Sequence, residues 1–487
     1  MPDPAPTKPQ DGVARTGDYL AFHAALRPRA TALVGKDRSL TFAELQERVR
    51  IAAGALAESG LQPGDLACVE WTGLIDHMSL LLALERLGVA SATFLPDAQQ
   101  QDHAEMLSHA DLILVDRFAA DKTRPSRRIE GIWAARSDDV APPETPADPQ
   151  AVYRMVTSSG TTGAPKVIAI TQGQTEPRLD VIQWMVGFST GSRFVHSMPY
   201  TFQGAQFQAS ACLRAGGTSI HVDLGGFWDN LSVLEATHTA VLPFHFTTLQ
   251  AEKTIRALPQ GLTVTSYGGA IPDPIRARLL ELRPDIRLFE TYATNELGTI
   301  AVRLPDGSHC CCPGSEVQIV DADHTPLPVG EEGTVRIRKT GMVAGYIYNP
   351  QATTEKFHDG WFYPGDIGVQ PEAGRFRILG RDDSLLNVGG LKFPAEEYER
   401  KLTALAEFED ACVLARPNAQ GENEAWVALV SEADLPFDAV AELVSSTLPE
   451  LIGRINIFTT RKIPRTASGK IQRQKVLDAL NRRDRAQ

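Results

Sequence analysis

The stretch VTSSGTTGAPKVIAIT, residues 156–171, combines hydroxyl side chains and glycines with a single lysine, Lys166. Backbone N–H groups and hydroxyls in a glycine-rich loop can surround an anion, and a lysine adds a point charge. The spacing differs from that of a Walker loop, in which the lysine follows a glycine and opens a helix; here Pro165 precedes the lysine and Val167 follows it. The stretch alone leaves two interpretations open, a phosphate-binding loop of another kind or an ordinary Ser/Thr/Gly turn.

Both flanks of this loop favour β-strands. VYRMVT, residues 152–157, and KVIAIT, residues 166–171, are rich in β-branched side chains. The loop is therefore predicted to join two strands, without a helix N-terminus to help bind an anion.

Strands and helices alternate outward from this loop. A helix is predicted in the segment after residue 39, capped by Thr41 with Glu44 three residues later, and short strands alternate with helices up to the strand IRLFETY, residues 286–292. This alternation indicates a parallel sheet with crossover helices. From about residue 308, short strands with Gly and Pro turns predict a β-rich part, and the last hundred residues read as α+β.

The fold class is therefore α/β, with at least two domains. We predict a disordered N-terminus at residues 1–15, a large N-terminal domain at 16–382 with a β-rich subdomain at 308–382, and a small α+β domain at 383–487. The boundary is placed at the charged turn LGRDDS, residues 379–384.

Composition excludes several classes of function. A net charge of −12 over 487 residues argues against nucleic acid or an anionic membrane as the main partner. The longest apolar run is broken by Glu85 and Arg86, so no membrane span is predicted. The six cysteines form no C-x-x-C pair, which argues against zinc and against a disulfide framework, and Cys310, Cys311 and Cys312 are expected in a buried strand. These features and a polar, Pro-rich start predict a cytoplasmic protein.

Six motifs then occur in one order along the chain: SSGTTGAPK, YGGA, TYATNE, WFYPGD, GRDDSLLNVGG and PRTASGK. Together they resemble the adenylate-forming superfamily of acyl-CoA synthetases, peptide-synthetase adenylation domains and luciferases, from LTFAEL to SGKIQR. The resemblance implies ATP and Mg²⁺ as cofactors and a small-molecule carboxylic acid as substrate, activated as an acyl adenylate. It also implies that the C-terminal domain is a mobile lid.

The resemblance assigns roles to individual residues. Lys166 would contact the β- and γ-phosphates, Glu296 would bind the metal, Tyr292 would stack on adenine, Asp366 would accept both ribose hydroxyls, and Arg381 would lie beside the ribose. The other expected nucleotide contacts are Ser158, Ser159, Gly160, Thr161, Thr162, Gly163, Gly268, Gly269, Ala270, Glu290, Ala293 and Asn295.

The C-terminal motifs carry further implied roles. Lys470 would bridge the carboxylate and the α-phosphate during adenylation, and is a catalytic residue with Lys166 and Glu296. Asp383 would be the hinge, and Gly389 and Gly390 would line the path of pantetheine.

Several positions depart from the family pattern. Glu290 replaces an Asn and could accept a hydrogen bond from the adenine amino group, while Asn295 replaces a Thr and could donate to a phosphate oxygen. Val167, Asn387 and Pro364 are further departures, which bear on affinity more than on reaction type.

Amino-acid-activating members of the family carry an aspartate that pairs with the substrate ammonium, and the corresponding stretch here, MPYTFQGAQFQ at residues 198–208, holds no carboxylate. The resemblance therefore argues against an α-amino acid as substrate. We expect an aryl or short-to-medium acyl acid instead. The pocket candidates are Phe202, Gln203, Phe207, Phe244, Tyr267 and Ala293.

The acceptor is left open by the sequence. LLNVGGLKFPAEEYE, residues 385–399, looks like the acyl-CoA ligase version of its motif, which favours CoA. A carrier-protein phosphopantetheine, an amine or another small nucleophile remain alternatives, and a catalytically silent nucleotide-binding regulator is an alternative of another class.

Overall fold

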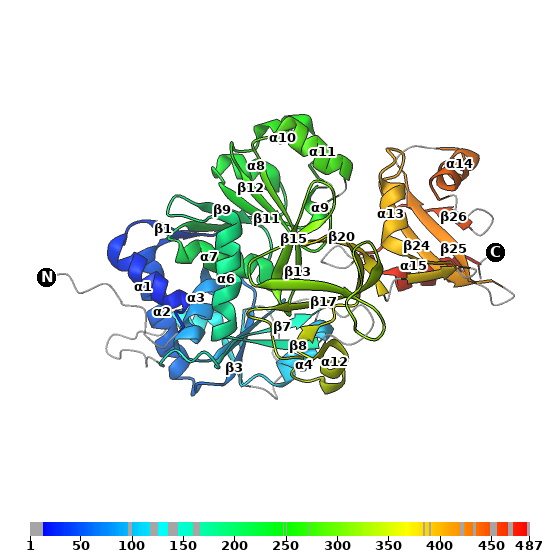
Figure 1. The fold of residues 1–487 in the computed structure, drawn as a ribbon. Coiled ribbons are helices and arrows are strands. Elements are labelled where there is room, and N and C mark those ends of the chain that lie inside the picture. Colours follow the sequence, from blue (N-terminus) through cyan, green and yellow to red (C-terminus); the bar gives the residue numbers. More distant parts are fainter. Residues whose placement is uncertain are drawn as a thin grey trace.

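The computed structural model describes residues 13–95, 100–116, 125–134, 145–158, 166–246, 248–249, 251–271, 273–382, 385–388, 391–418, 423–431, 435–448, 455–465 and 471–484. It is built on two large sheets, and a separate group of elements forms the C-terminal end of the molecule in Figure 1. The α/β prediction is confirmed.

The first sheet has six strands in the order β6-β5-β3-β4-β7-β8. Its parallel strands are β3 (Leu66–Glu70), β4 (Ala90–Phe94), β5 (Leu112–Val115), β6 (Ser126–Arg128) and β7 (Val152–Ser158). The helices connecting or packing on them are α2 (Phe42–Ala57), α3 (Leu74–Arg86), α4 (Gln100–Ser108) and α5 (Ile129–Ala134). The predicted cap is present, because at the start of α2 the backbone N–H of Glu44 donates to the Thr41 side chain and the backbone N–H of Thr41 donates to the Glu44 side chain.

The edge of this sheet carries the loop from which the sequence analysis began. β7 pairs antiparallel with β8 (Lys166–Thr171), and Ser158 lies opposite Lys166 in the register. The prediction that two strands flank the loop is confirmed. α6 (Gln172–Val186) follows β8 directly and is capped by Thr171 and Gln174.

The second sheet has fifteen strands and changes character along its length. Its parallel part contains β1 (Thr31–Val34), β9 (Arg193–His196), β10 (Thr218–His221), β11 (His238–Val241), β12 (Thr263–Ser266) and β13 (Arg287–Thr294), with β2 (Ser39–Thr41) antiparallel at the edge. The associated helices are α1 (Thr16–Leu26), α7 (Gln203–Arg214), α8 (Phe227–Val233), α9 (Pro243–Phe246), α10 (Glu252–Ala257) and α11 (Asp273–Leu282).

The antiparallel part begins at a hairpin between β13 and β14 (Gly298–Arg303). It continues through β15 (His309–Cys311), β16 (Ser315–Val320), β17 (Glu332–Lys339), β18 (Phe357–His358), β19 (Trp361–Phe362), β20 (Asp366–Glu372) and β21 (Arg375–Arg381), with α12 (Pro350–Lys356) between β17 and β18. The expected β-rich segment thus extends the sheet of the preceding α/β part. β13 belongs to both parts and carries most of the TYATNE motif.

The C-terminal elements pack around their own core. They comprise the hairpin β22 (Leu385–Val388) and β23 (Leu391–Pro394), the sheet β24 (Asp410–Pro417), β25 (Asn423–Val430) and β26 (Ile455–Thr459), and the helices α13 (Ala395–Thr403), α14 (Phe437–Thr447) and α15 (Arg473–Asp484). Val413, Val427 and Val444 are fully buried in this core. In Figure 1 these elements lie at the opposite end of the molecule from α1 and α2.

The described part of the chain contains no helix long and apolar enough to cross a membrane. All six cysteines are free; Cys310 is exposed, Cys311 is half-buried and Cys312 is buried. The expectation of a buried strand is therefore wrong for Cys310, which is exposed on β15, and Cys312 is buried just after that strand ends.

Candidate active site

Lys166 is held at the start of β8, where the loop returns to the sheet. Its Nζ lies 5.1 Å from the centre of the Tyr346 ring. Tyr346 is fixed beside β8 by a bridge to Ile168 and by the hydrogen bond from the Ile347 N–H to the Val167 carbonyl, 2.9 Å. The lysine side chain therefore lies beside Tyr346, which is distant in the sequence. The predicted loop contacts Ser159, Gly160, Thr161, Thr162 and Gly163, and the Ser158 side chain, lie outside the described residues.

Glu296 lies in the turn between β13 and β14 and is buried, with 6% of its surface exposed. The Tyr346 hydroxyl donates to its Oε1 at 2.8 Å. The pKa of Tyr346 is raised above its usual value, mainly by burial and also by the neighbouring Glu296 carboxylate. No described residue donates to Oε2. Lys166, Tyr346 and Glu296 thus form a short array of cation, phenol and carboxylate.

Arg178, which the sequence analysis did not single out, holds the turn that carries Glu296. It is 3% exposed, and its Nη1 and Nη2 donate to the carbonyls of Asn295 at 2.9 Å and Glu296 at 2.6 Å. Its Nε donates to the Gly341 carbonyl at 3.1 Å. Burial lowers the pKa of this guanidinium to about 10, so it stays charged at neutral pH.

Asn295 contacts the chain rather than standing free beside Glu296. Its Nδ2 donates to the Thr157 carbonyl at 3.2 Å, at the end of β7. The side chain thereby ties the Glu296 turn to the strand that enters the loop. Donation to a phosphate oxygen stays a prediction.

A second group joins side chains from three strands: Tyr292 of β13, Asp366 of β20 and Arg381 of β21. The Tyr292 hydroxyl donates to Asp366 Oδ2, and Arg381 Nη1 donates to Oδ1 at 3.4 Å. Asp366 and Arg381 face each other in the β20–β21 register. Burial, followed by the neighbouring Asp366 carboxylate, raises the pKa of Tyr292 well above its usual value. The structure thus brings together the three residues expected around the nucleoside.

The YGGA turn follows β12 beside this group. Gly268 has φ +83°, a left-handed conformation that side chains beyond Gly, Asn and Asp rarely adopt. Ala270 leads into Ile271, which is buried at the beginning of the connection to α11.

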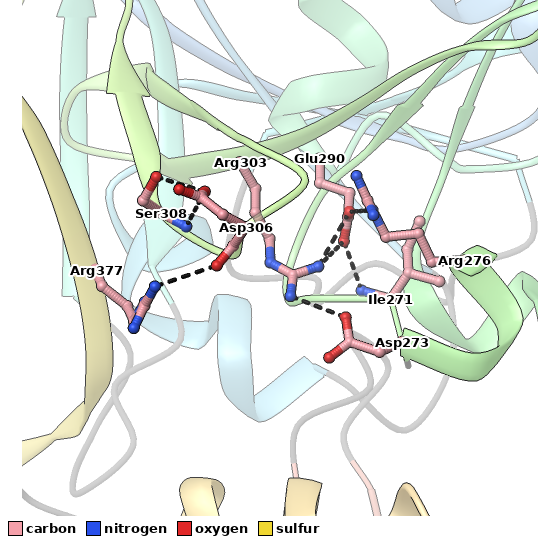
Figure 2. A network of polar contacts seen from close by, with 8 residues as sticks. All are labelled: Ile271, Asp273, Arg276, Glu290, Arg303, Asp306, Ser308 and Arg377. Carbon is pink, nitrogen blue, oxygen red and sulfur yellow. Dashed lines mark hydrogen bonds and ion pairs between the residues drawn. The ribbon is translucent and has the colours of Figure 1, made fainter. Parts of the chain in front are cut away.

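Glu290 lies near this turn in a dense polar network (Figure 2). Its Oε1 accepts from the Ile271 N–H at 3.0 Å and from Arg303 Nη1 at 3.3 Å. Its Oε2 accepts from Arg276 Nε at 2.7 Å and from the same Arg303 nitrogen at 3.3 Å. Four contacts occupy a carboxylate that has about four acceptor sites. A contact with the adenine amino group stays a prediction, and it would compete with these bonds.

Of the acyl-pocket candidates, Tyr267, just after β12, packs against α7. A Cβ on Gly204 would lie 3.2 Å from the Tyr267 ring, so this glycine permits close packing. Gln208 Nε2 donates to the Tyr267 hydroxyl at 2.8 Å, and burial raises the pKa of Tyr267 to about 12. Gln203 is 7% exposed, and no described residue accepts from its Nε2.

The other pocket candidates are less informative. Phe207 is buried in the main core and Phe202 packs against that core, whereas Ala293 lies half-buried in β13. The Phe244 side chain lies outside the described residues. Gln208 was not predicted, and a Gln on a helix gives no sequence signal that it supports a tyrosine on another element.

The C-terminal candidates Lys470, Asp383, Gly389 and Gly390 lie outside the described residues. Contacts hold the chain on either side of residues 466–470. Arg465 and Ile471 form an isolated bridge, and Arg465 Nη2 donates to Asp410 Oδ1 at 2.6 Å. Arg473 Nη2 donates to both Glu399 oxygens at 2.8 Å. The two ends of this segment are therefore held close together.

The residues fit a magnesium ion in one respect. Mg²⁺ is usually bound by one or two carboxylates together with substrate phosphates and water, and Glu296 offers one oxygen that no described residue occupies. The described residues contain no group of three or more His, Cys, Asp or Glu side chains that could hold a metal by themselves.

Comparison with known proteins defines the class. Residues 20–347 match the family described as AMP-binding enzyme. The 4-chlorobenzoate–CoA ligase of Arthrobacter sp. is 28% identical, covering 95% of this chain and 95% of that protein. Feruloyl-CoA synthase of Amycolatopsis sp. is 26% identical, covering 94% of this chain and 98% of that protein.

Solved structures show the same fold. The o-succinylbenzoate CoA synthetase of Bacillus subtilis, in complex with its acyl-adenylate intermediate, superposes with a TM-score of 0.83 at 20% identity, covering 94% of this chain and 97% of that chain. The same enzyme with ATP and magnesium gives a TM-score of 0.82 at 19% identity, covering 94% of this chain and 99% of that chain.

The protein is thus an enzyme of the AMP-forming ligase class. More particularly, the chain belongs to the AMP-binding enzyme family.

Proposed function

We propose that this ligase activates an aryl or short-to-medium acyl carboxylic acid with ATP and transfers the acyl group to the thiol of CoA. In the first step a carboxylate oxygen attacks the α-phosphorus, and the bond to pyrophosphate breaks. In the second step the thiol sulfur attacks the acyl carbon, the thiol proton is lost, and AMP leaves. The observation that carries this proposal is the placement of two groups of residues at β13. At one end of the strand, Lys166 and Glu296 both lie against Tyr346. On the strand itself, Tyr292 contacts Asp366, which in turn contacts Arg381.

The phosphate end supplies the charges that the first step needs. Lys166 would bind the phosphates, and Mg²⁺ held by Glu296 would neutralise charge as it moves onto pyrophosphate. The Tyr346 hydroxyl and the Arg178 guanidinium keep Glu296 in place by contacting its side chain and its backbone. A preorganised carboxylate needs little rearrangement when charge develops.

The nucleoside end supplies orientation. An ionised carboxylate accepts but does not donate, so Asp366 suits the two hydroxyl donors of a ribose. Tyr292 and Arg381 hold both oxygens of this carboxylate from the protein side. The ribose would thereby be fixed relative to Lys166 and Glu296.

The acid is proposed from the pocket and from the relatives. Gln203 and Tyr267 contribute polar groups without a formal charge, which does not favour an α-ammonium group. Two relatives are named for aryl or arylpropenoyl acids, 4-chlorobenzoate and ferulate. CoA is proposed as the acceptor because both relatives are named CoA ligases or CoA synthases.

The test is ATP-dependent pyrophosphate release over a panel of benzoates, cinnamates and C3–C8 fatty acids, with and without CoA. We expect release with at least one aryl or short acyl acid and a CoA thioester in the complete mixture. A thioester that forms only with a holo carrier protein, or an amide with an added amine, would replace CoA as acceptor. The absence of pyrophosphate release over the whole panel would contradict the proposal.

Lys470 gives the matched variant for this test. Its ammonium would stabilise the approach of two anions, so Lys470→Ala should slow adenylation by roughly a thousandfold with little change in ATP affinity. The same variant should still transfer the acyl group from chemically prepared acyl adenylate to CoA. Equal losses in both half-reactions would contradict this role for Lys470.

A further inference from the structure

The Glu290 carboxylate connects four pieces of chain that surround the expected nucleobase position. It lies on β13, bonds the N–H of Ile271 directly after the YGGA turn, and pairs with Arg276 on α11. Arg303 of β14 contacts both Glu290 oxygens and also bonds Asp273 Oδ1 at 2.9 Å, at the start of α11. Figure 2 shows Glu290 between the two arginines, with Ile271 and Asp273 on the same side of the network.

Glu290 and Tyr292 share one face of β13, because side chains two residues apart on a strand point the same way. Tyr292 is fixed from the other side by its hydrogen bond to Asp366. The Glu290–Ile271 bond fixes the turn formed by Gly268, Gly269 and Ala270 relative to the same strand. The β12–β13 pairing and the hydrogen bond from the Thr291 hydroxyl to the Ser266 carbonyl hold the start of the turn, and Glu290 holds its far end. Glu290 therefore contributes to the separation between this turn and the tyrosine ring.

Direct recognition of the adenine amino group by Glu290 is disfavoured by the bonds that it already makes. Three of its four contacts come from guanidinium groups, and charge-assisted hydrogen bonds are about twice as strong as neutral ones. The amino group is a neutral donor. Exchanging one of these bonds for it would leave an arginine that is 16% or 10% exposed partly unpaired.

We propose that Glu290 is a positioning residue for the nucleobase, which holds the Gly268–Ile271 turn at the spacing a purine needs beside Tyr292 and does not itself contact the amino group. The inference rests on the proposed use of ATP. Dispersion contacts lose about a quarter to a half of their attraction when a gap of 0.5–1 Å opens. A displaced turn would therefore weaken the binding of any purine, with or without an amino group.

The experiment is a cycle between protein variants and two nucleotides. Dissociation constants are measured by calorimetry for ATP and for purine riboside 5′-triphosphate, which lacks the amino group, with no acid present. The proteins are the wild type, Glu290→Gln, Arg276→Ala and the double variant Glu290→Met/Arg276→Met. The double variant replaces the ion pair with apolar side chains of similar length, so it keeps the test open where a single variant fails to fold.

We expect each variant to bind both nucleotides about tenfold more weakly, so that the ratio of the two dissociation constants stays at its wild-type value. Arg276→Ala should behave like Glu290→Gln, although its own side chain is the partner of Glu290. Arg278→Ala is the matched control, because Arg278 lies on the same helix, is 46% exposed and pairs only with Glu252 and Glu281 among the described residues. It should leave both constants unchanged.

Three outcomes would overturn the inference. In the first, the ratio falls to about one in the double variant, which would show that Glu290 contacts the amino group. In the second, thermal stability falls while both dissociation constants are unchanged, which would make the network merely structural. In the third, Arg276→Ala binds both nucleotides like the wild type. Failure of the wild type itself to bind ATP would instead contradict the proposed function.

Discussion

Two buried glutamates, Glu290 directly before the TYATNE segment and Glu296 at its end, have different surroundings. Glu290 is 3% exposed and accepts hydrogen bonds from Arg276, Arg303 and a backbone N–H, whereas Glu296 is 6% exposed and accepts from one phenol. Arg178 lies beside Glu296 but bonds its carbonyl, not its carboxylate. The comparison shows that burial alone does not define a binding carboxylate. What distinguishes the two is whether cationic side chains already occupy the oxygens, because a metal needs an oxygen that is still available.

The largest expected effect tests Glu296, whose Oε2 receives no hydrogen bond from a described residue. Glu296→Gln should lower acid-dependent pyrophosphate exchange by roughly a thousandfold, because a neutral amide is a poor ligand for a hard cation. Exchange is measured over a series of Mg²⁺ concentrations, with thermal unfolding as the check on the fold. If the variant exchanged pyrophosphate as fast as the wild type at limiting Mg²⁺, Glu296 would not be a metal ligand. The proposed difference between Glu296 and Glu290 would then be wrong.

Arg178 sharpens the comparison from the backbone side. Arg178→Met should lower the free energy of unfolding by about 3 kcal/mol, because one buried and two part-buried carbonyls lose their donor. The measurement is urea-induced unfolding of both proteins. Arg178→Lys, which keeps the charge but cannot reach all three carbonyls, should fall between them; a Met variant as stable as the wild type would show that the turn needs no such support.

A third buried carboxylate, Glu85, extends the comparison to one held by backbone donors. Its oxygens accept from the Thr16 and Gly17 N–H groups, yet burial raises its pKa from 4.5 to about 7. Between these two pKa values the folded protein keeps a proton that the unfolded chain releases. The stability that this carboxyl group contributes is therefore fully present below pH 4.5 and is lost as pH rises through about 7.

Glu85→Gln should remove about 2 kcal/mol of this decline, because the amide does not titrate. The measurement is the unfolding free energy at several pH values between 4 and 8 for the variant and the wild type. Glu399, whose pKa burial also raises to about 7, remains in both proteins and serves as the internal reference. Identical pH profiles would show that Glu85 is ionised in the folded state.

The smallest expected effect concerns the phenol on Glu296. Tyr346→Phe keeps the ring beside Lys166 but removes the hydrogen bond to Oε1, and should lower kcat/KM for ATP about fivefold. The loss should diminish at saturating Mg²⁺, since the metal then orients the carboxylate. A loss that does not depend on Mg²⁺ would indicate that the hydroxyl acts elsewhere.

Local features of the fold could be predicted from the sequence. The Thr41 cap, the strands that flank the loop and the alternation that builds the parallel sheets follow from short-range rules about capping, β-branching and periodicity. The grouping of Tyr292, Asp366 and Arg381 was predicted because each lies in a recognisable motif.

Other features could not be predicted, because their partners are distant or belong to the backbone. Among the described residues, Arg178 donates its side-chain hydrogen bonds to carbonyls, which look alike at every position of a sequence. Tyr346 meets Glu296 across fifty residues. The two arginine partners of Glu290 lie on α11 and β14 and belong to no motif, so the full set of bonds to this carboxylate is visible only when the elements are packed together.

The three consecutive cysteines offer a practical handle. Cys310 is exposed, whereas the thiols of Cys68, Cys212, Cys312 and Cys412 are buried, and burial raises the pKa of the half-buried Cys311 to about 11. A maleimide dye should therefore attach selectively at Cys310, since thiolates react and buried thiols are shielded. Cys310 pairs with Arg375 of β21, the strand that leads through Arg381 towards the C-terminal elements. A fluorophore at this position would test, without any engineered cysteine, the prediction that the C-terminal elements form a mobile lid.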